Sequence, residues 1–479
     1  MIGRIIAIVL TASLAMTVLS CASFISHAGN ERLIGDIDSD GSITVSDALA
    51  ELRVACGIDK CSEGDIPVYD VSGDGKVDVA DALGVLRCSL ELCDGFGCDG
   101  VVPECVPNDA ARSYGVTQEI FNDTVVSAGN TARLARVMER AAKGETINLV
   151  MLGGSITYGL YAAKSEQCYA NLTYNWWREN FTEADIRYHN VGISGTSSIL
   201  GVHRLERDVI AKDPDVVIVE FSVNDLQEDY PYYEGIVCNI LNKCPDAAVI
   251  MFFTVCQSGW TMQKTEIPIG EHYGVPMISG ANAVNGLIAS NTMKWSDFGA
   301  DDTHPNTKGH AIYASLLTSY FDAVKVKYAK LSKVVPAVPE PLYGDRYKNA
   351  KLYMGGELEA DSLGAWKIEG DYQASYLNHL KGAWRTAWRT IDSGKDMTFT
   401  ATFKELNVLY ISWINDTRAG SVTVKIDGSE VATLDSNFVG GWGNHITYET
   451  VFKTDKEAEH TITFTCNGGN FTLAGIMLS

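Results

Sequence analysis

Alternating apolar runs and amphipathic stretches organise the middle of the chain. Five runs have the length and continuous apolar character of buried strands, namely 147–152, 186–191, 216–222, 247–255 and 275–278. Helical patterns lie between or after them, at 130–143, 165–180, 198–212 and 306–328. Because strands that alternate with helices form parallel sheets covered on both faces, we expect one α/β domain over residues 116–333.

The pattern changes to a period of two beyond a proline-rich hinge at 334–341. Apolar side chains alternate with polar ones at 422–426, up to an Asp427-Gly428 turn, and again at 462–466, up to Asn467-Gly468. Each pattern predicts a β-hairpin. Residues 342–479 are therefore expected to form a β-sandwich.

An internal repeat of 34 residues marks the N-terminal region, with GDIDSDGSITVSDAL from Gly35 and YDVSGDGKVDVADAL from Tyr69. Residues 31–94 carry 15 acidic side chains against 5 basic ones. Calcium prefers six to eight oxygen ligands around a loop that turns at a glycine. The oxygens that fall at the required offsets are those of Asp36, Asp38, Asp40, Thr44 and Asp47, and of Asp70, Ser72, Asp74, Asp78 and Asp81, with the carbonyls of Ser42 and Lys76. The repeat predicts two calcium sites, and a solvated acidic surface is the alternative.

A duplicated calcium loop followed by a helix resembles the type I dockerin. The resemblance covers residues 33–92, so we expect a dockerin-like domain at 31–93 and a linker at 94–115. It implies docking to a cohesin domain of a scaffold protein through Val45, Ser46, Val79, Ala80 and the helix after each loop.

Composition and the N-terminus indicate an exported protein. Arg4, the apolar run 5–19 and the small-residue site Ser26-His27-Ala28 predict a signal peptide at 1–28. A cut after Ala22 and a lipid anchor on Cys21 are the alternatives, and no other stretch predicts a membrane span.

The net charge of −22 excludes nucleic acid as a favoured partner. Six cysteines between Cys56 and Cys105 could form disulfides in any of 15 pairings, or hold zinc, although no C-x-x-C spacing supports zinc.

Four segments of the α/β domain bring together the parts of an acyl-transfer site. Ser155 follows the strand in INLVMLGGSITYG, where Gly153 and Gly154 allow a sharp turn. Gly195 and Asn224 follow two further strands and could offer an N–H and an amide to an oxyanion. Asp301 lies three residues before His304, and a serine nucleophile needs such a base and a carboxylate that orients it.

The order of these blocks resembles the SGNH hydrolases, or GDSL esterases, over residues 116–333. The resemblance implies a flavodoxin-like α/β/α fold without a catalytic cofactor. It makes Ser155 the nucleophile, His304 the base and Asp301 its partner, and it places the N–H groups of Ser155 and Gly195 and the side chain of Asn224 in the oxyanion hole. Two positions depart from the family pattern, with Gly154 in place of the usual aspartate and Ser222 in place of the usual glycine. Asp302 is an alternative partner for His304.

Together the resemblances imply a secreted esterase, a component of a cellulosome, that deacetylates plant cell-wall polysaccharide. Acetylated xylan is the first expectation, followed by pectin and mannan. A lipase-like esterase for longer acyl chains and a non-catalytic carbohydrate-binding component are the alternatives. Five tryptophans of the sandwich could bind sugar or belong to its core, namely Trp366, Trp384, Trp388, Trp413 and Trp442.

Overall fold

The computed structural model divides the chain into two compact units, Met1–Gly100 and Val101–Ser479. It describes residues 34–62, 65–71, 76–90, 105–329, 331, 333, 335–370, 382–391, 393–439 and 445–479. The predicted signal peptide 1–28, Ser72, Asp74 and Trp442 lie outside the described residues. None of the helices within these ranges is long and apolar enough to cross a membrane.

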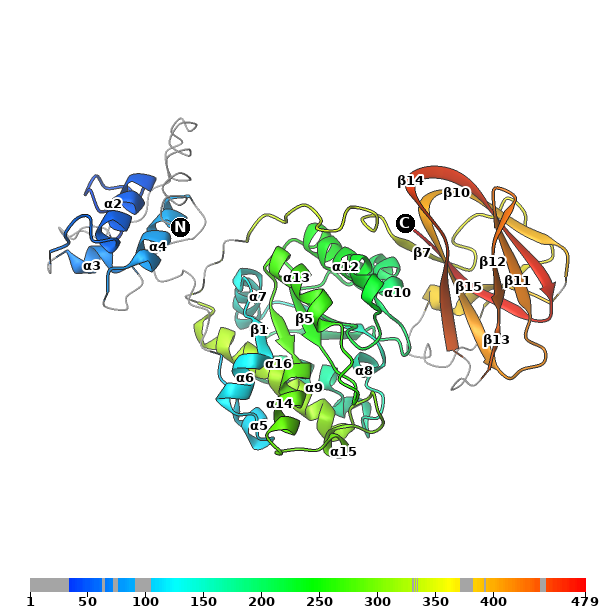
Figure 1. Cartoon of the computed structure of the whole chain (residues 1–479), viewed down its shortest axis with the longest axis horizontal. Coiled ribbons are helices and arrows are strands. Elements are labelled where there is room, and N and C mark those ends of the chain that lie inside the picture. Colours follow the sequence, from blue (N-terminus) through cyan, green and yellow to red (C-terminus); the bar gives the residue numbers. More distant parts are fainter. Residues whose placement is uncertain are drawn as a thin grey trace. The chain divides into compact units, whose positions relative to one another are not determined.

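The first unit is built from two similar helices, α2 (Val45–Ala55) and α4 (Val79–Ser89), with a short α3 (Ile66–Tyr69) between them (Figure 1). Each long helix begins with a capping box, formed by Thr44 and Asp47 in α2 and by Asp78 and Asp81 in α4. The helices bury a small apolar cluster that includes Ala48, Val71 and Val85. The helices of the two repeat units therefore pack against each other.

The second unit opens with a six-stranded sheet in the order β1-β6-β5-β4-β2-β3. Its strands are β1 (Val125–Ser127), β2 (Ile147–Gly153), β3 (Ile186–Asn190), β4 (Val216–Glu220), β5 (Ala248–Phe253) and β6 (Met277–Ser279). Strands β2 to β6 are parallel, and β1 pairs antiparallel to β6 at one edge. Relative to one another the parallel strands follow the flavodoxin-like order 2-1-3-4-5, which confirms the predicted fold class.

Side chains alternate along the buried strands between two separate cores. Leu149, Met151 and Ile218 face one core, whereas Val150, Leu152 and Val217 face the other. Helices α5 (Asp109–Ser113), α6 (Gln118–Thr124), α7 (Ala132–Ala142), α9 (Tyr169–Asn180), α14 (Gly280–Ala289) and α16 (Thr307–Lys327) cover the first face. Helices α10 (Ser198–His203), α11 (Leu205–Asp208), α12 (Tyr230–Lys243) and α13 (Gln263–Tyr273) cover the second. Both faces are covered, so every residue of β4 and β5 is buried.

Helices were harder to predict than strands. The single helix expected at 198–212 is broken into α10, α11 and the 3-10 turn Ile210–Lys212, and the first break falls at Arg204, whose guanidinium turns into the core. Helix α13 contains Pro268 in its interior, which is a helix-breaking signal, whereas α12 begins at a Tyr-Pro pair, where proline is tolerated in the first turn. The second half of the linker predicted at 94–115 is folded onto the α/β part. There α5 packs on α16, and the Asn108 amide donates to Thr318 and Asp322.

The C-terminal region is the predicted β-sandwich, formed by a nine-stranded sheet that is antiparallel except where β13 pairs with β10. Its strands are β7 (Lys351–Met354), β8 (Lys367–Gly370), β9 (Thr386–Thr390), β10 (Asp396–Ile414), β11 (Ser421–Ile426), β12 (Ser429–Asp435), β13 (Asn437–Phe438), β14 (His445–Gly468) and β15 (Phe471–Leu478). Strands β10 and β14 pair along almost their whole length, with register shifts around Lys404. Trp366, Trp384 and Trp388 are buried in its cores, so the sugar-binding interpretation is wrong for these three.

One of the two predicted hairpins forms. Strands β11 and β12 pair across Asp427 and Gly428, which both have positive φ as a tight two-residue turn requires. The second prediction, at Asn467-Gly468, is wrong. The end of β14 pairs with β11, whereas β15 crosses over to pair with β10, β9 and β7.

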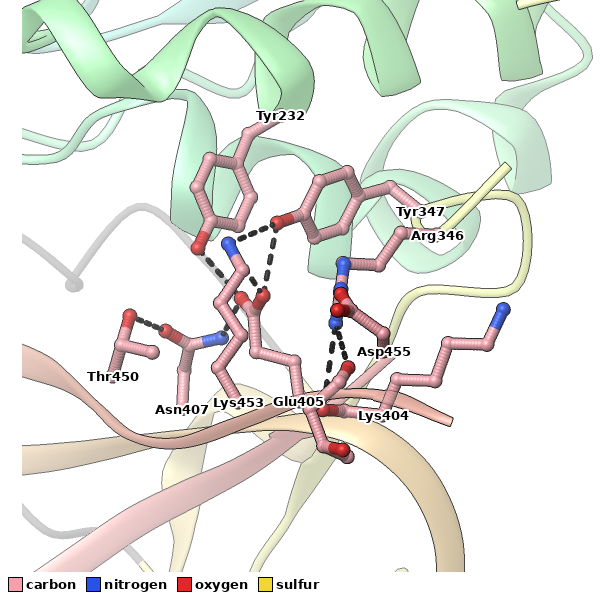
Figure 2. A network of polar contacts seen from close by, with 10 residues as sticks. Tyr232, Arg346, Tyr347, Lys404, Glu405, Asn407, Thr450, Lys453 and Asp455 are labelled. Carbon is pink, nitrogen blue, oxygen red and sulfur yellow. Dashed lines mark hydrogen bonds and ion pairs between the residues drawn. The ribbon is translucent and has the colours of Figure 1, made fainter. Parts of the chain in front are cut away.

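A polar network joins the α/β part of the second unit to the sandwich (Figure 2). At its centre Glu405 of β10 is fully buried and accepts hydrogen bonds from Tyr232 of α12 at 2.6 Å and from Tyr347 at 2.9 Å. Lys453 of β14 forms an ion pair with Glu405 at 3.1 Å. Burial acts to raise the pKa of Glu405, but the hydrogen bonds from Tyr232 and Asn407 and the charge of Lys453 outweigh it and hold the pKa below its ordinary value.

The segment predicted as a hinge is tied to the α/β part at its far end. The Glu234 carboxylate accepts hydrogen bonds from the backbone N–H groups of Leu342 and Tyr343, and the carbonyl of Glu340 lies 2.8 Å from His272 Nε2. The prolines therefore lead the chain along the α/β part before it enters the sandwich.

Candidate active site and calcium loops

Three side chains from the ends of distant segments meet at the carboxyl edge of the parallel sheet. Ser155 begins the short helix α8 (Ser155–Tyr158) directly after β2, and its Oγ lies 2.8 Å from His304 Nε2. His304 Nδ1 lies 2.8 Å from Asp301 Oδ2 and 3.1 Å from Oδ1. The structure thus brings the three predicted residues into one chain of hydrogen bonds, with the histidine between the hydroxyl and the carboxylate.

Asp301 is oriented by the backbone around it. The N–H groups of His304 and Thr303 donate to Asp301 Oδ1 at 2.7 and 2.8 Å. Partial burial acts to raise the pKa of Asp301, but these bonds and the contact with His304 outweigh it and keep the pKa below its usual value. The alternative, Asp302, points elsewhere, because its carboxylate accepts a hydrogen bond from the Thr303 hydroxyl at 3.1 Å.

Besides the Ser155 N–H, the two other expected oxyanion donors border the same edge. Gly195 lies between β3 and α10 with a φ of 73°, a left-handed conformation that favours glycine. Asn224 follows β4, and its Oδ1 is buried without a hydrogen-bond partner among the described residues. The amide NH2 is therefore the end of this side chain that is available to a substrate oxygen.

The two departures from the family pattern have local explanations. A Cβ at Gly154 would lie 2.3 Å from Asn224 Oδ1, so the usual aspartate would displace the Asn224 amide. Ser222 is fully buried, and its hydroxyl donates to Glu266 at 2.6 Å. Ser222 therefore occupies the core and adds no group to the site.

Sequence reasoning missed the buried polar residues beneath the site. Glu220 is fully buried, accepts hydrogen bonds from Thr157 and Thr254, and so connects the ends of β4 and β5 to α8. Arg204 is also fully buried, and it donates to the carbonyl of Val191 at 2.6 Å and to Asp208 at 2.9 Å. A signal did exist for Glu220, since an acid inside the apolar run VVIVEF must be buried and hydrogen-bonded.

Two large exposed aromatic side chains lie on segments that contact the loop of Asp301 and His304. Tyr161 is half exposed, and its ring centroid lies 5.5 Å from that of His304. Trp260 is also exposed, in the loop after β5, whose Gln257 N–H donates to the carbonyl of Asp302. Asp229, in the segment after Asn224, is buried and accepts the Leu226 N–H at 2.9 Å.

The first predicted calcium loop gathers its carboxylates as a cation site requires. Oxygens of Asp36, Asp38 and Asp40 lie within 4.8 Å of one another. Asp47 is buried and accepts the backbone N–H groups of Ile37 and Thr44, both at 2.8 Å, which closes the loop. Hard oxygen donors at this spacing fit a calcium ion.

Of the ligands predicted in the second loop, the structure describes Asp70, Lys76, Asp78 and Asp81, and Asp81 is buried. Between the two loops Glu51 is buried, and its burial, together with the charges of Asp81, Asp47 and Asp70, raises its pKa to about 8. Many acids in a small volume repel one another unless cations neutralise them.

The helices that follow the two loops expose apolar side chains. Val45 and Leu49 on α2, and Val79 and Leu83 on α4, are exposed at positions 34 residues apart in the repeat. With Ala48, Leu52, Ala82 and Leu86 they line a shallow groove between the two helices.

Comparisons with known proteins match two parts of the chain to families. Residues 151–312 match the model of the GDSL-like lipase/acylhydrolase family, and residues 34–87 match the model of the dockerin type I domain. A comparison with curated proteins finds no match.

Two crystal structures of a two-domain esterase active on acetylated mannans, one co-crystallised with mannopentaose, are similar over most of the chain. Each is 29% identical to this chain and covers 75% of it, with TM-scores of 0.68 and 0.69 over 97% and 98% of the esterase chain. An acetylxylan esterase from Geobacillus stearothermophilus is 22% identical, with a TM-score of 0.30, over 36% of this chain and 94% of its own.

Proposed function

Because this chain is a carboxylic ester hydrolase with a GDSL-like acylhydrolase domain and a type I dockerin domain, we propose that it removes acetyl groups from plant cell-wall polysaccharide outside the cell. The observation that carries the chemistry is the hydrogen-bonded chain from Ser155 through His304 to Asp301. In this proposal residues 31–93 dock, residues 116–333 catalyse and residues 342–479 form an accessory domain.

The geometry supports a two-step acyl transfer. His304 Nε2 takes the proton of Ser155 Oγ as the oxygen attacks the ester carbonyl, and the Asp301 carboxylate stabilises the resulting imidazolium. The N–H groups of Ser155 and Gly195 and the Asn224 amide receive the negative charge that develops on the carbonyl oxygen. His304 then returns its proton to the leaving sugar hydroxyl, and water releases acetate from Ser155 by the same path.

The proposed substrate is an acetylated hemicellulose. Likeness to an esterase active on acetylated mannans makes acetylated mannan the first to test, ahead of the acetylated xylan expected from the sequence. Tyr161 supports a sugar substrate, because its exposed aromatic ring beside His304 suits a pyranose ring.

We predict that the enzyme releases acetate from acetylated glucomannan or xylan and prefers acetyl to longer acyl esters. Each methylene buried in an apolar groove is worth about 0.8 kcal/mol, so a lipase-like groove would make rates rise with chain length. The measurement is kcat/KM for 4-nitrophenyl acetate, butyrate and octanoate, beside acetate release from each polysaccharide. Rates that increase towards octanoate would support the lipase-like alternative, and a folded protein without activity on any ester would support the non-catalytic one.

We propose that two calcium ions order the dockerin domain and that its apolar surface, formed by Val45, Leu49, Val79 and Leu83, binds a cohesin domain. The ions would be held by the predicted loop oxygens, of which those of Asp36, Asp38 and Asp40 already converge. Such docking would make the enzyme a component of a cellulosome.

We predict that chelation by EDTA unfolds this domain and ends cohesin binding, while esterase activity persists because the catalytic residues lie in the other compact unit. Calorimetry on the full chain should find two calcium ions, and Asp36→Asn should lose one of them. Asp59→Asn is the matched control, since Asp59 pairs with Arg53 outside the loops and its loss should leave calcium binding unchanged. Absence of calcium binding by the parent chain would contradict the proposal.

A further inference from the structure

The loop that carries Gly195 is held from outside the α/β part. Ile193, two residues before Gly195, is fully buried in an apolar cluster with Leu409, Ile411 and Ile446 of the sandwich. Ser197, two residues after Gly195, is buried against Tyr448 of β14. Gly195 itself is exposed and has a positive φ, whereas its neighbours Ser194 and Thr196 are buried and the Thr196 hydroxyl donates to the Ile193 carbonyl at 2.8 Å.

In the contact between Tyr448 and Ser197, the phenol hydroxyl acts both as a hydrogen-bond acceptor and as a donor. The Tyr448 hydroxyl accepts the Ser197 N–H at 2.8 Å and donates to Ser197 Oγ at 2.8 Å. Ser197 Oγ in turn accepts the Ile199 N–H as the N-cap of α10. Burial raises the pKa of Tyr448 to about 12, so the phenol keeps the proton that it donates.

The start of α10 also connects Gly195 to a second oxyanion donor, Asn224. Asp225, the neighbour of Asn224, accepts the Ser198 N–H at 2.7 Å. A shift of Ser197 would therefore be transmitted both back to Gly195 and across to Asn224.

A second residue of the sandwich supports the same region. The Trp384 Nε1 donates to Asp208 at 3.1 Å, and Asp208 pairs with Arg204, which donates to the carbonyl of Val191 at the start of the loop. Both ends of the loop that carries Gly195 thus depend on contacts with the sandwich.

We propose that Tyr448 is a positioning residue for ester hydrolysis, which fixes the Gly195 N–H in the oxyanion hole through Ser197 and so makes the sandwich part of the catalytic unit. The inference rests on the proposed function, since it requires Ser155 to be the nucleophile and Gly195 to be a donor. A displacement of a donor by a fraction of an ångström reduces the stabilisation of the transition state far more than that of the bound substrate.

The test is Tyr448→Phe, which removes one oxygen and keeps the packing of the ring. We expect kcat to fall by about tenfold with KM nearly unchanged, measured at 25 °C, well below the melting temperature of each variant. The rate of inactivation by diethyl 4-nitrophenyl phosphate should fall by a similar factor, because that reaction also places negative charge on an oxygen in the oxyanion hole.

Tyr232→Phe is the matched control, because Tyr232 also donates one phenolic hydrogen bond across the junction, to Glu405, but does not contact the loop (Figure 2). We expect Tyr232→Phe to lower the melting temperature and to leave kcat within about twofold of the parent, as for a purely structural contact. Should Tyr448→Phe fail to fold, Ser197→Ala removes the Oγ that accepts from Tyr448 but keeps the bond from the Ser197 N–H, so kcat should fall in the same direction by a smaller factor.

A normal kcat in folded Tyr448→Phe would overturn the inference, and so would equal losses in the Tyr448 and Tyr232 variants. Neither result would affect the proposed function, which instead fails if Ser155→Ala retains activity.

Discussion

Replacing Ser155 with alanine should lower kcat for 4-nitrophenyl acetate by at least about a thousandfold while the fold stays intact. The substitution removes the only atom that can form the acyl-enzyme in this mechanism, and the base at 2.8 Å is left without a proton to accept. Residual turnover would come from the oxyanion donors and from the binding of substrate alone.

The measurement is steady-state kinetics beside circular dichroism and a thermal melt. Ser165→Ala is a suitable control, because Ser165 begins a 3-10 turn on the surface and makes no contact with His304 among the described residues. Activity in a folded Ser155→Ala protein would show that another group is the nucleophile.

Replacing Asp301 with asparagine should lower kcat by about a thousandfold to ten-thousandfold. An amide at this position can present its NH2 to His304 Nδ1, which would then hold the imidazole in the tautomer that cannot accept the Ser155 proton. The loss should appear in kcat, with KM little changed, since Asp301 does not contact the substrate in this mechanism.

Asp302→Asn provides the matched control one residue away. Its carboxylate contacts Thr303 and not the imidazole, so kcat should stay within about twofold of the parent. If the two variants exchanged their effects, Asp302 would be the partner of His304.

The sequence predicted the elements whose signal is local. The five parallel strands were found within two residues of their ends, because apolar runs such as 216–220 are buried on both faces of the sheet. The hydrogen-bonded chain from Ser155 to Asp301 could be anticipated because each member follows a strand or precedes a helix, at the edge where such elements meet.

The remainder depended on contacts between distant segments. Nothing in the local pattern at Asn467-Gly468 reveals that β15 crosses to the far side of β10, since the turn residues suit a hairpin equally well. Likewise Tyr448 lies 251 positions from Ser197, and no spacing rule connects a phenol in a β-strand to the cap of a helix. Buried polar pairs of this kind are fixed by tertiary packing.

The buried cluster around Ile193, Leu200 and Leu409 has a consequence for how such a protein can be rearranged. A gene fusion that moves residues 34–90 to another enzyme would transfer a docking domain that forms a compact unit by itself. A truncation after the α/β region would instead expose apolar side chains to solvent and remove the contacts that hold both flanks of the Gly195 turn. Domain shuffling in evolution, like the construction of chimeric libraries, should therefore keep the α/β region and the sandwich together as one unit. The N-terminal repeat, by contrast, can be exchanged separately.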